Sequence, residues 1–421
     1  MHRLVRQLES RLARLAVPVA VQLPDGRRAG APNACVLLKF ERWSGVALMA
    51  AGQIGALGEG FVEHRIQMEG RMRDLMAAAA GLLPGHPAES DAPRWWRHLL
   101  QHARSRTAHS VERDAAQVQF HYDVSDDFYA LWLDPRRIYS CAYFARPGLT
   151  LDEAQEAKLD HICRKLMLAP GQRFLDIGAG WGGLLLWAAE HYGVDATGIT
   201  LSKNQQAYVE GLIAQKGLQG RVRMALCDYR ELDEAEPFDR IASVGMFEHV
   251  GRANMSAYFG KIRRLLTPGG LLLNHGITAG ALDAPQLGAG MGDFIEKYIF
   301  PGGELLHVSQ VLQATSQAGL EMLDTENLRP HYARTLWAWS DALEARLAEA
   351  RQVLGLTSQA GRAEKILRAY RLYLAGSAMC FEQGWLSLHQ MLVARPDPAC
   401  GAQAMPGAQS VYPFNRHYMY D

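Results

Sequence analysis

The spacing of hydrophobic residues first predicts a small region that mixes helix and strand. In residues 2–16 leucines recur every three or four positions and arginines occupy the other sides, which predicts an amphipathic helix. Residues 19–30 contain two extended pieces around a Pro-Asp-Gly triplet, a pattern typical of a hairpin. A further strand is predicted at 34–40, and helical spacing runs through 69–83. Proline and glycine in residues 83–93 then predict a linker.

From about residue 150, short apolar runs alternate with amphipathic helical stretches. This alternation predicts parallel strands joined by helical crossovers, which is a doubly wound α/β sheet. Residues 337–394 return to helical spacing, and 396–421, rich in Pro, Gly and polar residues, are expected to form a loosely packed tail. We therefore predict a Rossmann-like α/β domain with helical insertions, preceded by a smaller α+β domain. Its candidate strands are residues 173–179, 195–200, 221–227, 239–245 and 270–276.

These patterns divide the chain into four segments. The segments are an N-terminal domain at 1–90, a basic linker or helix at 91–114, the α/β domain at 115–395 and the tail at 396–421. The second segment carries arginines together with two adjacent tryptophans, a combination that suits an anionic lipid surface. A solvated helix that packs against a neighbour explains this stretch, and the N-terminal helix, equally well.

Composition narrows the class of protein only a little. The 421 residues suit two or three domains, and the apolar fraction of 48% allows a large core. Lys plus Arg and Asp plus Glu both number 44, so net charge says nothing about partners, and no nucleic-acid partner is expected. The six cysteines lack zinc-site spacing, which favours a reduced, cytoplasmic chain without a metal. Because no signal-peptide core and no run of ~20 apolar residues is present, we expect a soluble or peripheral protein.

A glycine-rich motif is the strongest local signal. Asp176, Gly178 and Gly180 lie where a predicted strand ends and a helix begins, so backbone N–H groups can face a ligand there. The second strand ends in Thr200 without the acidic residue that a dinucleotide enzyme needs, which argues against NAD. The motif resembles motif I of class I methyltransferases, in which the glycines face the amino-acid part of S-adenosylmethionine.

The end of the third strand supplies two more candidates. In class I methyltransferases this position lies beside the adenine, so Asp228 is expected to accept from the exocyclic amine and Tyr229 to cover the ring. In the alternative interpretation Asp228 only caps a turn and Tyr229 belongs to the core.

Four further segments carry a more specific resemblance. Together they closely resemble the cyclopropane-fatty-acid synthases and the related mycolic acid cyclopropane synthases, over about residues 115–395. The segments are HYDVSDDFYALWLDPRRIYSCAYF (121–144), GITLSKNQ (198–205), SVGMFEHVG (243–251) with LLNHGIT (272–278), and RPHYARTL (329–336).

The resemblance implies roles for particular residues. Those that match the family's S-adenosylmethionine site are Tyr139, Ser140, Gly178, Gly180, Thr200 and Gln205. Those that match its bicarbonate site are Cys141, Glu248, His275 and Tyr332, with the backbone N–H of Ile277, and His121 matches an active-site histidine. Taken singly, each side chain has an ordinary structural explanation, such as packing for the cysteine or a core position for the histidine. Their common placement after successive strands favours the functional interpretation.

The resemblance also implies a reaction. A methyl group would pass from S-adenosylmethionine to the cis double bond of a phospholipid acyl chain, and a bicarbonate ion would remove a proton from the resulting cation as a cyclopropane ring closes. A methyl-branched or methylene product is the alternative within the same fold. A lipid-transfer protein with a decayed methyltransferase domain is disfavoured by the intact motifs. The partner implied is a phospholipid membrane, with the chain peripheral on its inner face, and a homodimer stays open.

Overall fold

The computed structural model describes residues 2–82, 126–282, 305–357, 360–397, 413 and 415–420. His121, the linker predicted at 83–93 and the basic segment at 91–114 lie outside these residues. Among the described residues, no helix combines the length and the apolarity needed to cross a membrane.

The N-terminal unit is a four-stranded sheet covered by helices. Its strand order is β2-β1-β3-β4, in which β1 and β3 run parallel and the other neighbours run antiparallel. The predicted hairpin is confirmed as β1–β2, whereas β4 was not predicted. The strands are β1 (Val19–Gln22), β2 (Arg28–Gly30), β3 (Val36–Phe40) and β4 (Ile66–Glu69), and the helices are α1 (His2–Leu12), α2 (Trp43–Ala51), α3 (Ile54–Val62) and α4 (Met72–Leu82).

The predicted amphipathic helix is α1, and its apolar side is buried against the rest of the N-terminal unit. Leu8 and Leu12 are buried in the core of the N-terminal unit, while Arg3 and Arg6 are exposed. Of the two interpretations of this helix, packing against a neighbour therefore accounts for its leucines. Only its arginine-bearing side faces outward.

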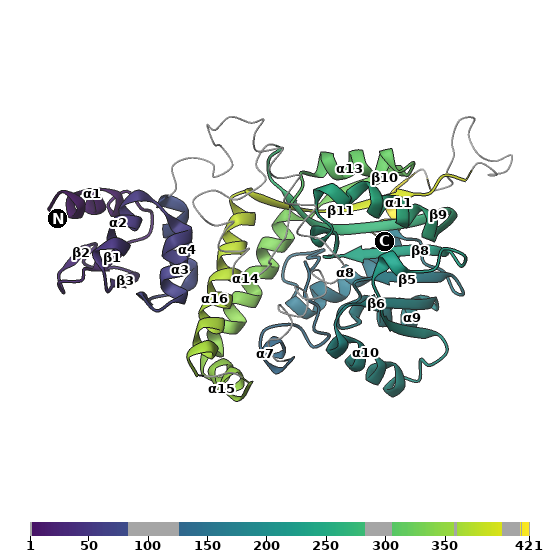
Figure 1. The fold of residues 1–421 in the computed structure, drawn as a ribbon, viewed down its shortest axis with the longest axis horizontal. Coiled ribbons are helices and arrows are strands. Elements are labelled where there is room, and N and C mark those ends of the chain that lie inside the picture. Colours follow the sequence, from purple (N-terminus) through teal and green to yellow (C-terminus); the bar gives the residue numbers. More distant parts are fainter. Residues whose placement is uncertain are drawn as a thin grey trace.

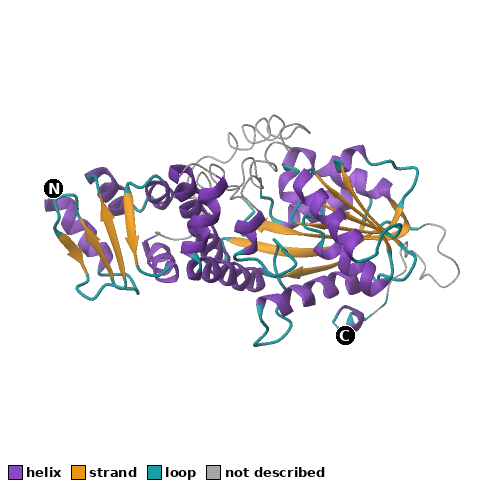
Figure 2. Cartoon of the chain, turned by 90° about the horizontal axis from the view of Figure 1, so that it is seen from below, coloured by secondary structure: helices purple, strands orange, loops and turns teal. Residues whose placement is uncertain are grey.

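The second and larger unit is a seven-stranded sheet with helices on both faces (Figure 1, Figure 2). Its order is β10-β11-β9-β8-β5-β6-β7, and β11 runs antiparallel to both neighbours. The doubly wound α/β fold and all five predicted strands are confirmed. The strands are β5 (Arg173–Ile177), β6 (Asp195–Thr200), β7 (Val222–Leu226), β8 (Phe238–Val244), β9 (Leu266–Ala279), β10 (Glu321–Asn327) and β11 (Leu386–Ala394).

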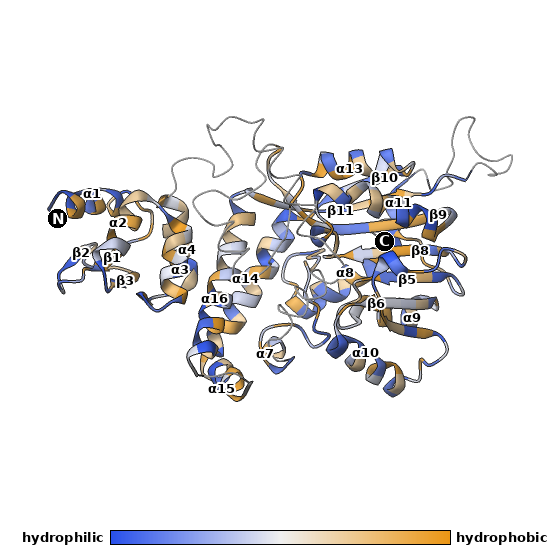
Figure 3. Cartoon of the chain, in the orientation of Figure 1, coloured by the Kyte–Doolittle hydropathy of each residue, from blue (hydrophilic) through white to orange (hydrophobic). Residues whose placement is uncertain are grey.

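Two apolar cores flank this sheet. One core joins the strands to α8 (Leu151–Lys165), α9 (Gly183–Tyr192) and α10 (Lys203–Gln215). The other core joins them to α11 (Met255–Leu265) and α13 (Val308–Gln317). Hydrophobic and hydrophilic residues are interspersed along these helices (Figure 3), and the buried ones belong to the two cores. Because β5 to β9 run parallel, their carboxyl ends lie at one edge of the sheet.

A pair of long helices joins the two units. The helices α14 (Arg329–Ala345) and α16 (Ala360–Glu382) pack together, and α16 also contacts α3 and α4 of the N-terminal unit. Polar contacts cross the same seam, including Arg73 with Asp341 at 2.6 Å and Lys365 with Glu63 at 2.7 Å. The short helices beside this pair are α7 (Asp126–Ala130) and α15 (Leu347–Thr357).

Two predictions for the C-terminal part were wrong. Residues 386–394 form strand β11 and not helix; every residue of this strand is buried, so the apolar–polar alternation that marks a half-buried strand is missing. The described end of the tail is not loosely packed, because Met419 is 1% exposed against α8 and its carbonyl lies 2.9 Å from Nδ1 of His161.

Candidate functional site

A pocket opens at the carboxyl ends of β5, β6, β7 and β8. Its floor is the glycine-rich turn between β5 and α9, where Gly178, Gly180 and Gly182 have φ values of 76°, 56° and 80°. These left-handed values favour glycine over any residue with a Cβ. A Cβ on Gly180 would meet no atom closer than the Gly178 carbonyl oxygen at 4.0 Å, so this position faces open space.

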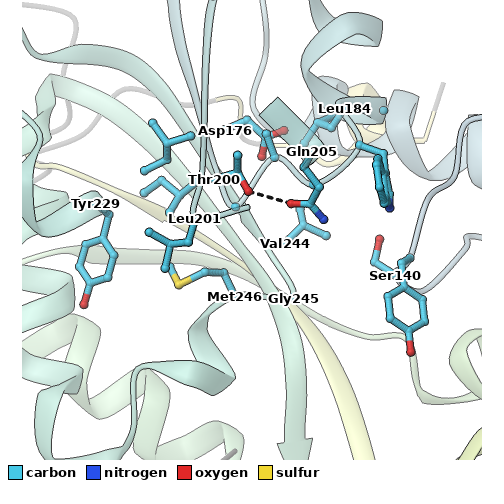
Figure 4. Close-up of a pocket in the computed structure, with 18 of the residues that line it drawn as sticks. Ser140, Asp176, Leu184, Thr200, Leu201, Gln205, Tyr229, Val244, Gly245 and Met246 are labelled. Atoms are coloured by element: carbon cyan, nitrogen blue, oxygen red, sulfur yellow. Dashed lines mark hydrogen bonds between the residues drawn. The ribbon is translucent and has the colours of Figure 1, made fainter. Parts of the chain in front are cut away.

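The nine residues predicted to bind the cofactor all line this one pocket. Figure 4 shows Ser140, Asp176, Gln205 and Tyr229 around the same space, although they come from separate elements. They are Tyr139, Ser140, Asp176, Gly178, Gly180, Thr200, Gln205, Asp228 and Tyr229. The fold therefore places together residues that span ninety positions of the sequence.

Gln205 has a hydrogen-bonding group left over for a ligand. Its Oε1 accepts a hydrogen bond from Oγ1 of Thr200 at 2.7 Å (Figure 4). Its Nε2 is buried and has no partner among the described residues. A buried donor without a partner costs free energy, so a polar ligand such as the amino-acid part of S-adenosylmethionine fits this position.

Asp228 and Tyr229 combine the two interpretations that the sequence left open. Asp228 caps a short helical turn, accepting from the backbone N–H of Arg230 at 2.9 Å and pairing with the Arg230 guanidinium at 2.7 Å. Tyr229 packs edge-on against Tyr258, with ring centroids 5.3 Å apart. Both residues nevertheless line the pocket, so capping and packing hold them at its wall.

Lys158 belongs to the pocket but was not predicted. It lies on α8, is 2% exposed, and donates a hydrogen bond from Nζ to Oγ of Ser140 at 2.9 Å. Burial lowers its pKa to about 8, although nearby Asp134 raises it. A signal was present in the sequence, because Lys158 shares a helical face with the apolar Ala154 and Ile162.

Burial also changes the charge of Asp176. Desolvation raises the pKa of this carboxyl to about 7, and the nearby Lys158 ammonium opposes the change. The aspartate that opens the glycine motif therefore holds a proton more readily than an exposed aspartate does.

A second group of predicted residues lies behind the pocket, on β9 and the turn after β8. His275 is buried, and Nε2 of Gln390 on the adjacent strand β11 lies 3.2 Å from its Nδ1. Burial first, and then the charges of Lys158 and Lys165, lower the pKa of His275 well below its ordinary value, so the ring is neutral. With Nδ1 accepting from the amide, the proton resides on Nε2, which has no partner among the described residues. Gln390 was not predicted as a site residue.

Glu248 faces the same region with one free oxygen. Its Oε1 accepts a hydrogen bond from the Ile277 backbone N–H at 2.6 Å, and its buried Oε2 has no partner among the described residues. Burial raises its pKa to about 7. The amide of Ile277 was expected to hold an anion directly; here it holds the carboxylate instead, because the strand places the amide against Oε1.

Cys141 and Tyr332 share the apolar core on which Ile277 packs. Burial raises the pKa of the Cys141 thiol far above its ordinary value, so the sulfur stays protonated; Sγ lies 3.9 Å from the Leu328 carbonyl oxygen. Tyr332 is 7% exposed and packs against Phe381, with ring centroids 4.7 Å apart. The thiol is a neutral donor and has no thiolate character.

The raised pKa of Glu248 predicts a pH-dependent gain of stability in Glu248→Gln. In the folded protein its pKa of about 7 exceeds the ordinary 4.5, so its stabilising contribution is complete below pH 4.5 and is lost as pH rises toward 7. Relative to the parent, the glutamine variant should gain roughly 1–3 kcal/mol in free energy of unfolding between about pH 5 and pH 8. Denaturant unfolding at the two pH values measures the difference.

The matched control is Glu210→Gln on the exposed side of α10. This variant should follow the parent at both pH values. An identical pH dependence in the parent and Glu248→Gln would show that Glu248 ionises in the folded protein as it does in the unfolded chain.

Comparisons with known proteins agree with this geometry. The family model described as mycolic acid cyclopropane synthetase matches residues 109–391. A probable fatty acid methyltransferase of Pseudomonas putida is 40% identical over 396 residues, covering 93% of this chain and 96% of the relative. Cyclopropane mycolic acid synthase 1 of Mycobacterium tuberculosis is 41% identical over 283 residues, which are 65% of this chain and 95% of that protein.

Solved structures give the same result. The cyclopropane synthase MmaA2 from Mycobacterium tuberculosis superposes with a TM-score of 0.61 at 36% identity, covering 66% of this chain and 98% of that one. The mycolic acid cyclopropane synthase CmaA1 complexed with SAH and CTAB also has a TM-score of 0.61, at 39% identity and the same coverage. The N-terminal unit lies outside the matched family-model residues, whereas the alignment to the Pseudomonas putida relative covers 93% of the chain and therefore includes most of this unit.

Proposed function

Because the chain belongs to the mycolic acid cyclopropane synthetase family, we propose that it transfers a methyl group from S-adenosylmethionine to the cis double bond of a phospholipid acyl chain and closes a cyclopropane ring. Family membership itself makes the chain an S-adenosylmethionine-dependent methyltransferase that acts on lipid chains. Ring formation, the phospholipid substrate and a bicarbonate base are the parts that we propose.

One observation carries the bicarbonate proposal. Two buried atoms near the cofactor pocket have no partner among the described residues: the donor Nε2 of His275 and the acceptor Oε2 of Glu248. Bicarbonate has both acceptor oxygens and one O–H donor, so it can satisfy both atoms at once. A purely apolar ligand would leave both unsatisfied, at a cost of about 1–3 kcal/mol each.

The chain's own residues hold the two ligands in different ways. The glycine turn would let S-adenosylmethionine approach the backbone, and Gln205 would offer its free amide N–H group to the amino-acid part of this ligand. When bound, S-adenosylmethionine supplies an electrophilic methyl group and bicarbonate supplies a base of small size. His275 would donate to the anion, and Glu248 would accept its proton. Cys141 and Tyr332 would complete the shell as neutral donors, since the thiol pKa is strongly raised by burial.

The surroundings suit an intermediate with positive charge. A carbocation on the acyl chain must be kept from water until the proton leaves, so the site needs apolar walls. Tyr332 belongs to a core with Trp339 and Phe381, and Phe247 is buried beside Glu248 on the same turn. Aromatic faces stabilise a nearby cation without attacking it. A covalent role for Cys141 is not needed, and a protonated thiol is a poor nucleophile.

The test is lipid mass spectrometry after expression in a bacterial host that lacks cyclopropane lipids. Unsaturated phospholipid chains should gain the mass of one CH2, and the gain should survive catalytic hydrogenation without uptake of hydrogen. Cells that express His275→Ala are the control, because this variant keeps the cofactor pocket and loses the donor to the anion. A gain that takes up hydrogen would identify a methylene product instead, and unchanged phospholipids would exclude this substrate class.

The same protein, purified, tests the membrane proposal. The exposed Arg3 and Arg6 of α1 support attraction to anionic lipid. Vesicles that contain anionic cis-unsaturated phospholipid should therefore be modified faster than neutral vesicles, and added salt should remove the difference. Equal rates at low salt would contradict an electrostatic approach to the membrane.

A further inference from the structure

Lys158 is a buried charge for which the proposed reaction has no assigned use. It lies on α8 and lines the cofactor pocket, where it contacts Ser140, the residue before Cys141. Among the described residues it makes one hydrogen bond, to Ser140, and no ion pair. Burying an ammonium group without a paired carboxylate is costly, so its retention needs an explanation.

The proposed anion site has an unbalanced charge. His275 is neutral and Cys141 is protonated, because burial shifts the pKa of each toward the neutral form. Glu248 adds negative charge whenever it ionises. An anion buried among neutral donors and a carboxylate is stabilised by a nearby positive charge, which offsets part of the cost of desolvation.

The other buried basic side chains nearby already contact a carboxylate. Lys165 and His161 both contact Oε2 of Glu326, at 2.5 Å and 2.8 Å. Asp134, the strongest acidic neighbour of Lys158, is itself held by the backbone N–H groups of Ile138 at 2.8 Å and Arg136 at 3.0 Å. Among the described residues no carboxylate forms an ion pair with Lys158, although Asp134 and Asp176 act on its charge from farther away. The same charge acts on His275 and Cys141.

We infer that Lys158 is the counter-charge of the bicarbonate site: it is held by Ser140, one residue before Cys141, and its ammonium group offsets the negative charge of the bound anion. This inference rests on the proposed function.

Four variants separate charge from hydrogen bonding. Lys158→Met removes both, Lys158→Gln keeps a donor for Ser140 without the charge, and Lys158→Arg keeps the charge. Ser140→Ala removes the hydrogen bond and leaves the charge. Bicarbonate binding is followed by NMR of the isotopically labelled ion in degassed buffer, and S-adenosylmethionine binding by calorimetry.

The dissociation constant for bicarbonate should rise at least about tenfold in Lys158→Met and Lys158→Gln alike. Lys158→Arg should restore most of the affinity, and Ser140→Ala should change it by less than about threefold. S-adenosylmethionine affinity should not fall together with bicarbonate affinity in Lys158→Met, because loss of the ammonium group removes a like charge from the pocket that takes the cationic sulfonium. A merely structural lysine would lower both affinities together and would not be rescued by arginine.

The two failures are distinguishable. If the parent protein binds no bicarbonate, the proposed base is wrong; if the parent binds it and Lys158→Met binds it equally well, the counter-charge is wrong. If the Lys158 variants do not fold, displacement of bicarbonate from the parent protein tests whether the site prefers a negative charge. Nitrate, a planar anion, should displace bicarbonate, whereas acetamide, a neutral molecule of similar size, should not. Equal displacement by both would overturn the inference.

Discussion

Gly180→Val should abolish S-adenosylmethionine binding while the protein stays folded. The position has a φ of 56°, and a Cβ would point into open space in the pocket, with no atom closer than 4.0 Å. The valine side chain would therefore occupy the volume that the ligand needs. The dissociation constant measured by calorimetry should rise by more than about a hundredfold, which corresponds to about 2.7 kcal/mol.

Part of the effect of valine is backbone strain, so the control must share it. Gly171 has a φ of 80°, lies in an exposed turn before β5, and would also place a Cβ in open space. Gly171→Val should therefore lose a similar amount of stability and keep its affinity for the donor. Normal binding in Gly180→Val would place the cofactor elsewhere.

Gly276→Ala should stop turnover and leave the donor site intact. Gly276 lies on β9 between His275 and Ile277, and an added Cβ would overlap the Phe247 ring and lie 2.8 Å from Oε1 of Glu248. The strand is central and cannot move away, so Glu248 must leave the Ile277 amide. Turnover should fall by more than about a hundredfold, because the proposed bicarbonate base loses the Glu248 oxygen that accepts its O–H.

Donor affinity separates this effect from a collapsed fold. In Gly276→Ala it should stay within about threefold of the parent, since the glycine turn after β5 is untouched. Gly260→Ala on α11 is the control, because the nearest atom to its Cβ is the end of a flexible arginine at 3.6 Å. Full activity in Gly276→Ala would show that the position of Glu248 is not critical.

The sequence predicted the sheet well where strands differ in pattern from helices. The strands β5 to β9 are short apolar runs with helical crossovers, so both the period and the topology were visible. Strand β11 was missed because it is buried on both faces, and its continuous apolar run resembles a buried helix. Strand β10 is only partly buried and carries charged residues, which gave no strand signal.

The candidate site divides in the same way. The glycines were predictable because the left-handed backbone conformation of this turn is readily adopted by glycine alone. Gln390 was not, because its importance depends on burial and on a neighbour more than a hundred residues away. Lys158 stood out on an apolar helical face, but that pattern did not show that it contacts Ser140. The Ile277 amide illustrates the remaining gap, since a motif identifies a residue without saying which neighbour its N–H will contact.

The core on the long helices has a consequence for modularity. Phe61 and Met76 of the N-terminal unit lie in the same apolar cluster as Trp339, Tyr332 and Cys141. The two units therefore do not form separate interiors, because they share one apolar core. Losing the first unit would expose the apolar residues that support the second. An exchange of N-terminal units between relatives would therefore have to preserve the apolar contacts on α16.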